Sequence, residues 1–256
     1  MGRLDGKLAL VTGASRGYGR AIAQRLARDG AVVAAHYATN DKAMTATLSS
    51  IAAEGGTAFP VKSNLDGSQK TIDALFISLD RGLVELGRQP TIDILVNNAA
   101  ICLRGSIEET TEEIFDGVFN VNVKAPFFLV KEALKRIPDG GRVVNISSQT
   151  SLVAFPGIAA YSMTKGAIDL MTLVLAKQLG PRQITVNAVL PGVADTDMNA
   201  DWLPGNAAGL AYVNSISALG RICDVTDIAD IVGFLASHDG RWITGQRIDA
   251  AGGSQL

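Results

Sequence analysis

The chain has 256 residues, of which 47% are hydrophobic and 19% charged, and its formal net charge is −2 at pH 7. This length suffices for one large α/β domain, and this composition excludes a disordered chain. The near-neutral charge, without a block of Lys or Arg, gives no support to nucleic-acid binding.

Short apolar runs and longer helical patterns alternate along the chain. The strand candidates, in order, are residues 8–11, 31–36, 58–61, 92–96, 142–146, 185–189 and 246–249. Helical patterns lie between them over residues 19–28, 44–53, 71–86, 112–135 and 161–179. Apolar strands that alternate with helices are typical of a parallel sheet covered on both faces. We therefore predict a single Rossmann-like domain over residues 1–256, a doubly wound α/β fold with about seven strands.

One stretch, residues 191–219, departs from this alternation. It is rich in Gly, Asn, Pro and Ala, which predicts a loop with a short helix. Open parallel sheets bind ligands beyond the carboxyl ends of their strands, so the residues that follow each strand are the candidates for a site. We expect residues 192–219 to form a lid over a substrate.

A glycine-rich loop follows the first strand. Residues 12–19 read Thr-Gly-Ala-Ser-Arg-Gly-Tyr-Gly, with glycines at positions 13, 17 and 19 between a strand and a helix. Glycines allow a tight turn and let backbone N–H groups approach a pyrophosphate, and the helix N-terminus adds partial positive charge. The loop therefore predicts a dinucleotide site.

The same loop contains a pattern from another class of enzyme. Residues 13–17 match G-x-S-x-G, the nucleophile elbow of serine hydrolases, and His238 lies downstream of Ser15. Two features oppose this alternative. The pattern follows the first strand, with no earlier strand to carry an oxyanion-hole loop, and it leaves Gly19 and the later motifs unexplained. A serine hydrolase is the less favoured hypothesis.

The end of the second strand indicates which dinucleotide binds. NAD sites usually place an acid there to hold the ribose 2′-hydroxyl, whereas residues 34–40 contain none. Arg16 can reach the same space and pair with a 2′-phosphate, and His36, Thr39 and Asn40 offer further donors. Taken singly, Arg16 is as readily a solvated surface residue and His36 a strand-end histidine. Together with the missing acid they predict NADP(H).

Two adjacent serines and a Tyr/Lys pair suggest an active site. Ser147 and Ser148 directly follow the fifth strand, and Tyr161 and Lys165 are spaced i, i+4, which places them on one face of a helix. A nearby ammonium favours the phenolate, so we expect Lys165 to lower the pKa of Tyr161 and let it transfer a proton. A Tyr/Lys pair alone is more often a surface feature of an amphipathic helix. The preceding Ser-terminated strand and the glycine loop favour catalysis.

With these motifs in order, the chain resembles the short-chain dehydrogenase/reductase family from Lys7 to Gly253. Residues 12–19 look like the family's cofactor loop, and residues 97–100 look like its NNAG motif, with Ala100 in place of Gly. Ser148 lies thirteen positions before Tyr161, as the family's catalytic serine does. Among family members the chain is similar to NADP(H)-dependent ketoreductases such as 3-oxoacyl-[acyl-carrier-protein] reductase.

The resemblance implies a role for each of these residues. It implies that Ser148 polarises a carbonyl, Tyr161 protonates the developing alkoxide, and Lys165 bonds the nicotinamide ribose. It also implies that Asn122 holds a water in a proton relay. The chain would then reduce a ketone reversibly to a secondary alcohol by hydride transfer, without a metal. Two positions besides Ala100 depart from the family: Tyr18 replaces the usual Ile, and Asn64 replaces the usual Asp beside the adenine.

The predicted site residues fall into three groups. The catalytic residues are Asn122, Ser148, Tyr161 and Lys165. The cofactor-binding residues are Gly13, Ser15, Arg16, Gly17, Tyr18, Gly19, His36, Tyr37, Ala38, Thr39, Asn64, Leu65, Asn98, Ala99, Ala100, Tyr161, Lys165, Pro191, Gly192, Val193 and Thr196. The substrate-pocket residues are Cys102, Leu103, Thr150, Phe155, Met198, Trp202 and Leu203.

Other expectations concern partners and location. We expect a small-molecule carbonyl or alcohol substrate, no nucleic acid, no membrane and no metal. The two cysteines lack CxxC spacing, and no leader or spanning segment is evident, which favours a cytoplasmic protein. The helices over 112–135 and 161–179 are apolar nearly all round, which predicts a homo-oligomer, most simply a homotetramer. A non-catalytic NADP-binding regulator is a further alternative.

Overall fold

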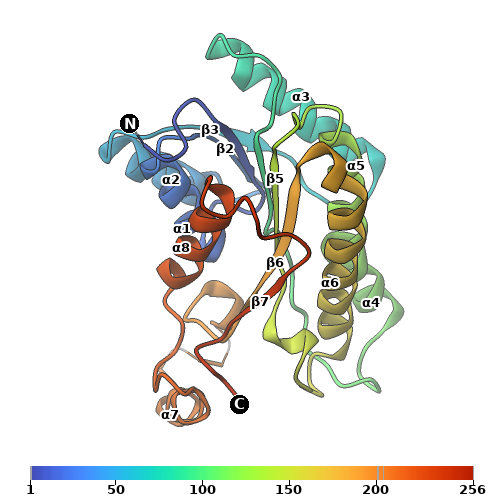
Figure 1. The fold of residues 1–256 in the computed structure, drawn as a ribbon. Helices are drawn as coiled ribbons and strands as arrows, with labels where there is room; N and C mark the ends of the chain where they lie inside the picture. Colours follow the sequence, from blue (N-terminus) through green and yellow to red (C-terminus); the bar gives the residue numbers. More distant parts are fainter. Residues whose placement is uncertain (1, 201, 204, 256) are drawn as a thin grey trace.

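A seven-stranded parallel sheet forms the centre of the computed structural model, which describes residues 2–200, 202–203 and 205–255 (Figure 1). The strands are β1 (Leu8–Val11), β2 (Val32–Tyr37), β3 (Thr57–Lys62), β4 (Ile94–Asn97), β5 (Arg142–Ile146), β6 (Thr185–Pro191) and β7 (Arg247–Ala250). Their order is β3-β2-β1-β4-β5-β6-β7. The predicted single α/β domain with a Rossmann-like sheet is confirmed.

Helices cover both faces of this sheet, as the apolar strands require. On one face lie α1 (Gly17–Arg28), α2 (Asp41–Ala53) and α8 (Val225–Ala236). On the other lie α3 (Gln69–Glu85), α5 (Ala125–Ala133) and α6 (Ala159–Leu179). Figure 1 shows the two layers to either side of the strands. Each layer encloses its own apolar core, so the strands are buried on both faces.

The helix predicted over 112–135 is interrupted. It consists of α4 (Glu112–Phe119), one π-helical turn (Asn120–Lys124) and α5. A π turn inserts one residue into the helical repeat and is frequent at functional sites. Here it carries Asn122, so the departure from a regular helix falls on a predicted catalytic residue.

Helix α8 lies outside the helical patterns predicted from the sequence. Its N-terminus has a clear signal, because Asp224 and Asp227 form a reciprocal capping box. Ile228, Val232 and Leu235 follow at helical spacing and are fully buried. These apolar residues pack α8 against α1 and the sheet, which explains why the helix is stable despite its short length.

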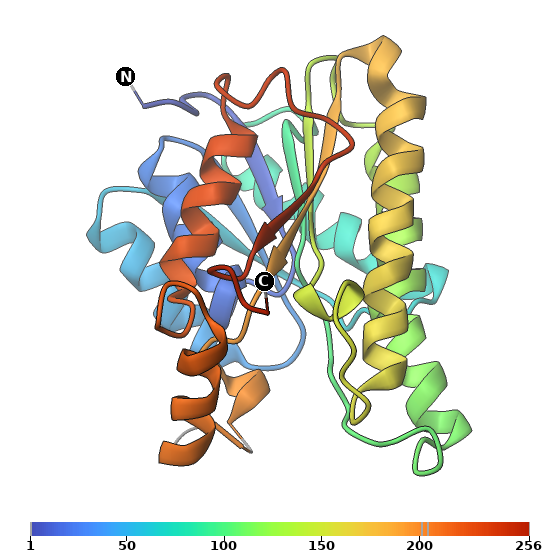
Figure 2. The same cartoon turned by 60° about the horizontal axis from the view of Figure 1, so that its bottom comes forward.

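The predicted lid, residues 192–219, leaves the sheet at the end of β6 and includes two positions, 201 and 204, outside the described residues. It contains a short 3₁₀ turn (Asp197–Asn199) and α7 (Ala207–Ile216). Figures 1 and 2 show α7 apart from both helical layers, at the end of the molecule reached by the carboxyl ends of β6 and β7. This is the edge of the sheet at which ligands are expected.

The direction of chain progression reverses between β1 and β4, which are hydrogen-bonded neighbours. From β1 the chain continues outward through β2 and β3, and from β4 it continues outward through β5, β6 and β7. Loops that leave the two strands at this point diverge and open a crevice. The glycine loop after β1 and the segment after β4 therefore face the same space.

Candidate active site

The glycine loop has the geometry of a phosphate cradle. Gly13 adopts a φ of +66°, a left-handed conformation that other residues rarely accept. A Cβ atom at Gly19 would lie 2.1 Å from the carbonyl oxygen of Gly13, so only glycine fits there. The first turn of α1 carries no acidic residue, and Arg16 at the N-cap makes no side-chain capping bond. Neither an acid of this turn nor the Arg16 side chain therefore competes with an anion for its backbone N–H groups.

The segment after β4 braces this loop. The Thr12 hydroxyl accepts hydrogen bonds from the backbone N–H groups of Asn98 (2.9 Å) and Ala99 (3.0 Å). The Asn98 amide donates to the carbonyls of Thr12 (2.8 Å) and Gly13 (3.2 Å). Asn98 and Ala99 thus fix the shape of the loop. At a cofactor site these two residues would therefore act by shaping the glycine loop, and not by presenting a free side chain to the ligand.

His36 has a structural task that the sequence analysis did not identify. Its Nδ1 accepts from the Gly13 N–H (3.2 Å), and its Nε2 lies 2.9 Å from the Ser63 carbonyl, to which it donates. Burial lowers the pKa of His36 to about 4, so the ring is neutral at pH 7. Both ring nitrogens are engaged. The expectation that the His36 side chain offers a donor to a phosphate is therefore corrected.

The end of β2 carries an aromatic residue, and the start of α2 carries an acid that is neutralised by a lysine. The Tyr37 hydroxyl donates to Asp41 (2.7 Å), and Lys62 donates to the same carboxylate at 2.8 and 2.9 Å. Burial, and then the bond to Asp41, raise the pKa of Tyr37 to about 12. Because Lys62 neutralises Asp41, this carboxylate does not oppose a phosphate with an unpaired negative charge. Thr39 is exposed beside them.

Arg16 reaches from the glycine loop to the lid. Its guanidinium pairs with Asp197 at 2.9 Å, and both side chains are about three-fifths exposed, at 61% and 60%. Asn64, after β3, is also exposed, whereas Leu65 is buried. Arg16 is an exposed cation at the mouth of the site, a position suited to an incoming phosphate.

Ser148, Tyr161 and Lys165 converge behind the carboxyl end of β5. All three are buried, with Lys165 only 3% exposed. The Lys165 ammonium donates to the Ile146 carbonyl (2.8 Å), which ties α6 to the end of β5. It also lies 5.4 Å from the centre of the Tyr161 ring. Tyr161 and Lys165 are brought together by their spacing on α6, and Ser148 joins them from the end of β5.

The structure separates the roles of the two adjacent serines. The Ser147 hydroxyl donates to the Lys165 backbone carbonyl (3.2 Å), so it fastens α6 to β5. Ser148 caps the short turn that follows, accepting from the Thr150 N–H (3.2 Å), and it is the serine whose side chain acts to lower the pKa of Tyr161. Ser148 is therefore the serine that faces the phenol.

Asn122 is fixed by the chain around it. Its amide oxygen accepts from the Ile101 N–H (2.9 Å), and its amide nitrogen donates to the Ile101 carbonyl (2.8 Å) and the Thr164 hydroxyl (3.2 Å). Both amide hydrogens are used, so the side chain joins the π turn to the segment after β4 and to α6. A relay water at this residue would have to meet its backbone carbonyl or the remaining lone pair of the amide oxygen.

The pKa of Tyr161 differs from the expectation. Burial raises it above its usual range, the electrostatic effect of Cys102 adds to this, and the bond with Ser148 lowers it in part. The predicted lowering by Lys165 is not seen, because desolvation of the phenolate dominates. Burial lowers the pKa of Lys165 to about 8, while Asp169 and Cys102 act to raise it.

Asp169 is a residue near the site that the sequence analysis missed. It lies one turn beyond Lys165 on α6, is buried, and neither carboxylate oxygen has a hydrogen-bond partner among the described residues. A buried acid without a partner is costly, and its attraction to Lys165 offsets part of that cost. The i, i+4 spacing from Lys165 was the signal that could have found it.

The predicted substrate-pocket residues lie on three segments beyond the strand ends. Cys102 and Leu103 follow β4, Thr150 and Phe155 follow β5, and Met198 and Trp202 belong to the lid. Leu203 is buried, so it packs inside the lid. The Arg104 guanidinium lies 5.4 Å from the Trp202 ring centre, which joins the segment after β4 to the lid. Arg104 was not among the predicted residues.

The hydrolase alternative is wrong. Ser15 follows the carboxyl end of β1, whereas His238 follows α8 beside Ser237, whose carbonyl accepts from Arg142 at the amino end of β5. The two residues lie at opposite ends of the parallel strands, so they cannot form a catalytic pair.

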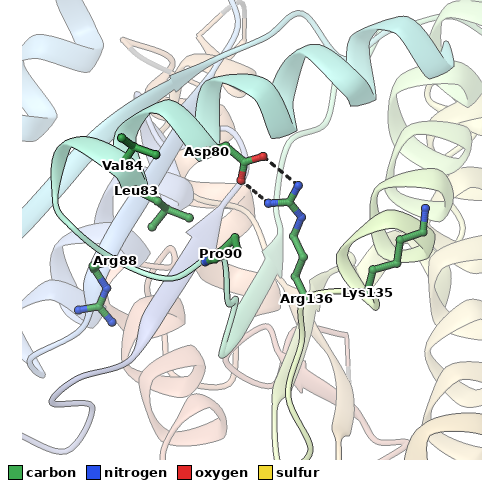
Figure 3. A pocket seen from close by; sticks show the side chains of 7 residues that line it. All are labelled: Asp80, Leu83, Val84, Arg88, Pro90, Lys135 and Arg136. Carbon is green, nitrogen blue, oxygen red and sulfur yellow. Dashed lines mark hydrogen bonds and ion pairs between the residues drawn. The ribbon is translucent and has the colours of Figure 1, made fainter.

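A surface pocket, shown in Figure 3, is also remote from the active-site groups. Its walls come from the ends of α3 and α5 and from the loop before β4, at the amino ends of the strands. Its Asp80 and Arg136 form an ion pair across it. Since these charges satisfy each other, the pocket adds nothing to the site after β5.

Within the described residues, no helix is long and apolar enough to cross a membrane. The same residues contain no group of three or more His, Cys, Asp or Glu that could hold a metal ion.

Comparison with known proteins agrees with this geometry. A family model described as enoyl-(acyl carrier protein) reductase matches residues 13–255. An uncharacterised oxidoreductase of Methylorubrum extorquens is 40% identical over 256 residues, covering 99% of each chain. The chain belongs to the short-chain dehydrogenase/reductase family.

Two solved structures resemble the chain more strongly. One is the landomycin C-6 ketoreductase LanV with bound NADP and rabelomycin, 48% identical with a TM-score of 0.91, covering 100% of this chain and 98% of that one. The other is the promiscuous reductase LugOII, which catalyses keto-reduction at C1 during lugdunomycin biosynthesis. It is 48% identical with a TM-score of 0.94, covering 99% of this chain and 100% of that one.

Proposed function

We propose that this protein is an NADP(H)-dependent ketoreductase. The observation that carries the proposal is the buried set of Ser148, Tyr161 and Lys165 at the carboxyl end of β5, the same end of the parallel sheet at which the glycine loop follows β1. The nucleotide-bound ketoreductases among the similar structures support it. Carbonyl reduction needs an acid and an orienting hydrogen-bond donor at one point, and this set provides both.

The residues present fit a dinucleotide phosphate. The uncapped first turn of α1 would receive the diphosphate, Arg16 the 2′-phosphate, and Thr39 with Asn64 the adenosine end. Pro191 to Val193 and Thr196 would adjoin the nicotinamide. Lys165, whose ammonium keeps donors beyond its bond to Ile146, would bond the ribose.

In the proposed reaction, NADPH, when bound, supplies the hydride that the carbonyl carbon accepts. Ser148 donates a hydrogen bond to the carbonyl oxygen and orients it. Tyr161 gives its hydroxyl proton to that oxygen as negative charge develops, which completes the alcohol and leaves a phenolate. The Lys165 ammonium beside the ring stabilises this phenolate electrostatically. Asn122 supports return of a proton to Tyr161 by way of water.

We further propose that the substrate is a polycyclic aromatic ketone. Support comes from the names of the two ketoreductases and from the apolar rim of the site. Large side chains on that rim stand 40–56% exposed, which is unfavourable without a ligand or partner to cover them. They are Leu103, Leu152, Met198, Leu210 and Tyr212. A flat aromatic ligand would cover this surface and stack beside Trp202.

The deciding assay follows NADPH oxidation with four substrates: rabelomycin, a simple aryl ketone, a 3-oxoacyl thioester and an enoyl thioester. The proposal expects an alcohol product, with the highest kcat/KM for the polycyclic ketone. Reduction of the enoyl thioester alone would instead favour the reaction named for the matching family model. NADPH binding without turnover of any substrate would favour a non-catalytic regulator.

A homotetramer is part of the same proposal. Phe127, Met163, Leu170 and Val174 stand 55–63% exposed on α5 and α6, which lie side by side in both ribbon views (Figures 1 and 2). Trp242, which is 93% exposed, marks a second surface near α8. Dihedral tetramers require two different interfaces, and two separate apolar surfaces suit that symmetry. We also propose a cytoplasmic location.

A further inference from the structure

Tyr18 makes a contact that Ile, the usual residue at this position of the family, could not make. It occupies the second position of α1, and its hydroxyl donates to the carbonyl of Gly192 at 3.2 Å. Gly192 is the first residue after β6, where the chain enters the lid. The glycine loop and the start of the lid are thus joined by one side-chain hydrogen bond.

The other end of the lid reaches the same hydroxyl. Cys223, which follows the lid and precedes α8, donates its backbone N–H to the Val193 carbonyl at 2.9 Å. Ala194 and Cys223 also form an isolated parallel bridge. The Cys223 thiol, which donates to the Asp224 carbonyl (3.2 Å), lies near enough to the Tyr18 hydroxyl to affect its pKa, so this hydroxyl lies beside both roots of the lid.

The environment of this hydroxyl makes the contact consequential. Burial raises the pKa of Tyr18 well above its usual range, and Cys223 and Tyr161 add to the effect. A buried hydroxyl that loses its partner incurs a desolvation cost, so the bond to Gly192 resists opening. The electrostatic influence of Tyr161 also shows that Tyr18 lies on the active-site side of α1.

Neighbouring contacts between α1 and the lid are weaker. Arg16 and Asp197 form an exposed ion pair, of a kind that contributes little to stability. A Cβ at Gly17 would lie 3.6 Å from the Thr196 methyl, so the two segments are also in close approach there. Among the described contacts between these segments, the Tyr18 bond is part-buried, whereas the Arg16–Asp197 pair is exposed.

We propose that Tyr18 is a positioning residue that holds both roots of the lid against the turn of α1 that receives the cofactor. Because of this link, the closed lid has a fixed position relative to the nicotinamide site. Substrate binding then depends on a hydroxyl in the cofactor loop. This inference rests on the proposed function in so far as the substrate lies beneath the lid.

The test is Tyr18→Phe, which removes the hydroxyl and keeps the ring. An intramolecular hydrogen bond contributes about 1 kcal/mol, so we expect KM for the ketone to rise about fivefold, with kcat and the Kd of NADP⁺ within about twofold of wild type. Ser50→Ala is the matched control, because its hydroxyl accepts from Gln24 of α1 (2.8 Å) but lies away from the lid. It should leave all three constants unchanged.

A second readout is independent of turnover. The chain has two tryptophans, so Trp242→Phe leaves Trp202 in the lid as the only one. With NADP⁺ saturating, acrylamide should quench Trp202 more strongly in the Tyr18→Phe variant than in its parent. Cys223→Ala should produce a smaller change in the same direction, and Cys223→Ser, which keeps a hydrogen-bonding group, should restore the parent value.

Unchanged quenching and KM in Tyr18→Phe would overturn the proposal. An equal rise in KM and in the Kd of NADP⁺ would also overturn it, because Tyr18 would then belong to the cofactor site alone. If Tyr18→Phe does not fold, the Cys223 pair decides by the same quenching criterion. A wild type that reduces no carbonyl would defeat the proposed function, yet the quenching test would still stand.

Discussion

Arg16→Ala tests which residue recognises the cofactor's 2′-phosphate. In the structure the Arg16 guanidinium pairs with Asp197 at 2.9 Å, and both groups are exposed. Hydrogen bonds to charged groups contribute about 1.5–3 kcal/mol, whereas an exposed ion pair contributes about 0–1 kcal/mol. Since the phosphate must replace Asp197, the net contribution should be about 1–2 kcal/mol. That corresponds to about 5- to 30-fold weaker NADPH binding in the variant.

The assay is titration of nucleotide fluorescence with NADPH and NADH at fixed ionic strength, because exposed charges are screened by salt. NADH, which lacks the phosphate, should bind Arg16→Ala within about twofold of its wild-type affinity. Arg16→Lys keeps the charge but loses the planar fork, so its affinity for NADPH should lie between those of the wild type and of Arg16→Ala. Asp197→Ala removes the competing carboxylate and should tighten NADPH binding by up to about fivefold. Equal losses for both nucleotides in Arg16→Ala would refute the assignment.

Four further predictions test catalysis and assembly. Tyr161→Phe should fold and bind NADPH but lose nearly all turnover, because only the transferable proton is removed; a kcat above about a tenth of wild type would identify another acid. Asp169→Asn should move the alkaline limb of kcat/KM to lower pH, because loss of the carboxylate lowers the pKa of Lys165 further below about 8 and activity is lost as pH rises through it. An unmoved limb would contradict this. Trp202→Ala should raise KM for the polycyclic ketone, and an unchanged KM for every substrate would show that Trp202 does not line the site. Light scattering at micromolar concentration should give about four times the chain mass of 26.8 kDa, and a mass equal to it would refute assembly.

The sheet could be predicted from local patterns because buried parallel strands are continuous apolar runs. β1 and β5 occur at the predicted residues, 8–11 and 142–146. β4 begins two residues later than predicted, at Ile94, because Ile92 is equally apolar but precedes the ladder. The π turn had no local signal, since residues 112–135 keep a helical pattern. It depends on the bonds that Asn122 makes to Ile101 and Thr164, which are distant in sequence.

In the candidate site, too, only the features that depend on local spacing could be predicted from the sequence. Tyr161 and Lys165 could be paired from the sequence because i, i+4 spacing fixes their relative position on one helix. The role of His36 could not be read from its own segment, because its partners Gly13 and Ser63 belong to the loops after β1 and β3. Likewise, Tyr18 could be recognised as unusual, but its partner Gly192 lies across the crevice. Residue types and local spacing can be read from a sequence, whereas bonds between distant loops depend on the packed sheet.

The charges around Tyr161 favour reduction over oxidation. Burial keeps the phenol protonated, and a protonated phenol is a competent acid for an alkoxide but cannot act as a base toward an alcohol. Once the proton has left, a phenolate stands beside the Lys165 ammonium, 5.4 Å from the ring centre, in a buried site where opposite charges attract more strongly than in water. Before transfer, the bond to the Ile146 carbonyl and the electrostatic effects of Asp169 and Cys102 offset part of the cost of burying Lys165. Burial still disfavours the phenolate relative to water, as the raised pKa of Tyr161 shows, so in the proposed mechanism the Lys165 ammonium offsets part of the cost of proton donation.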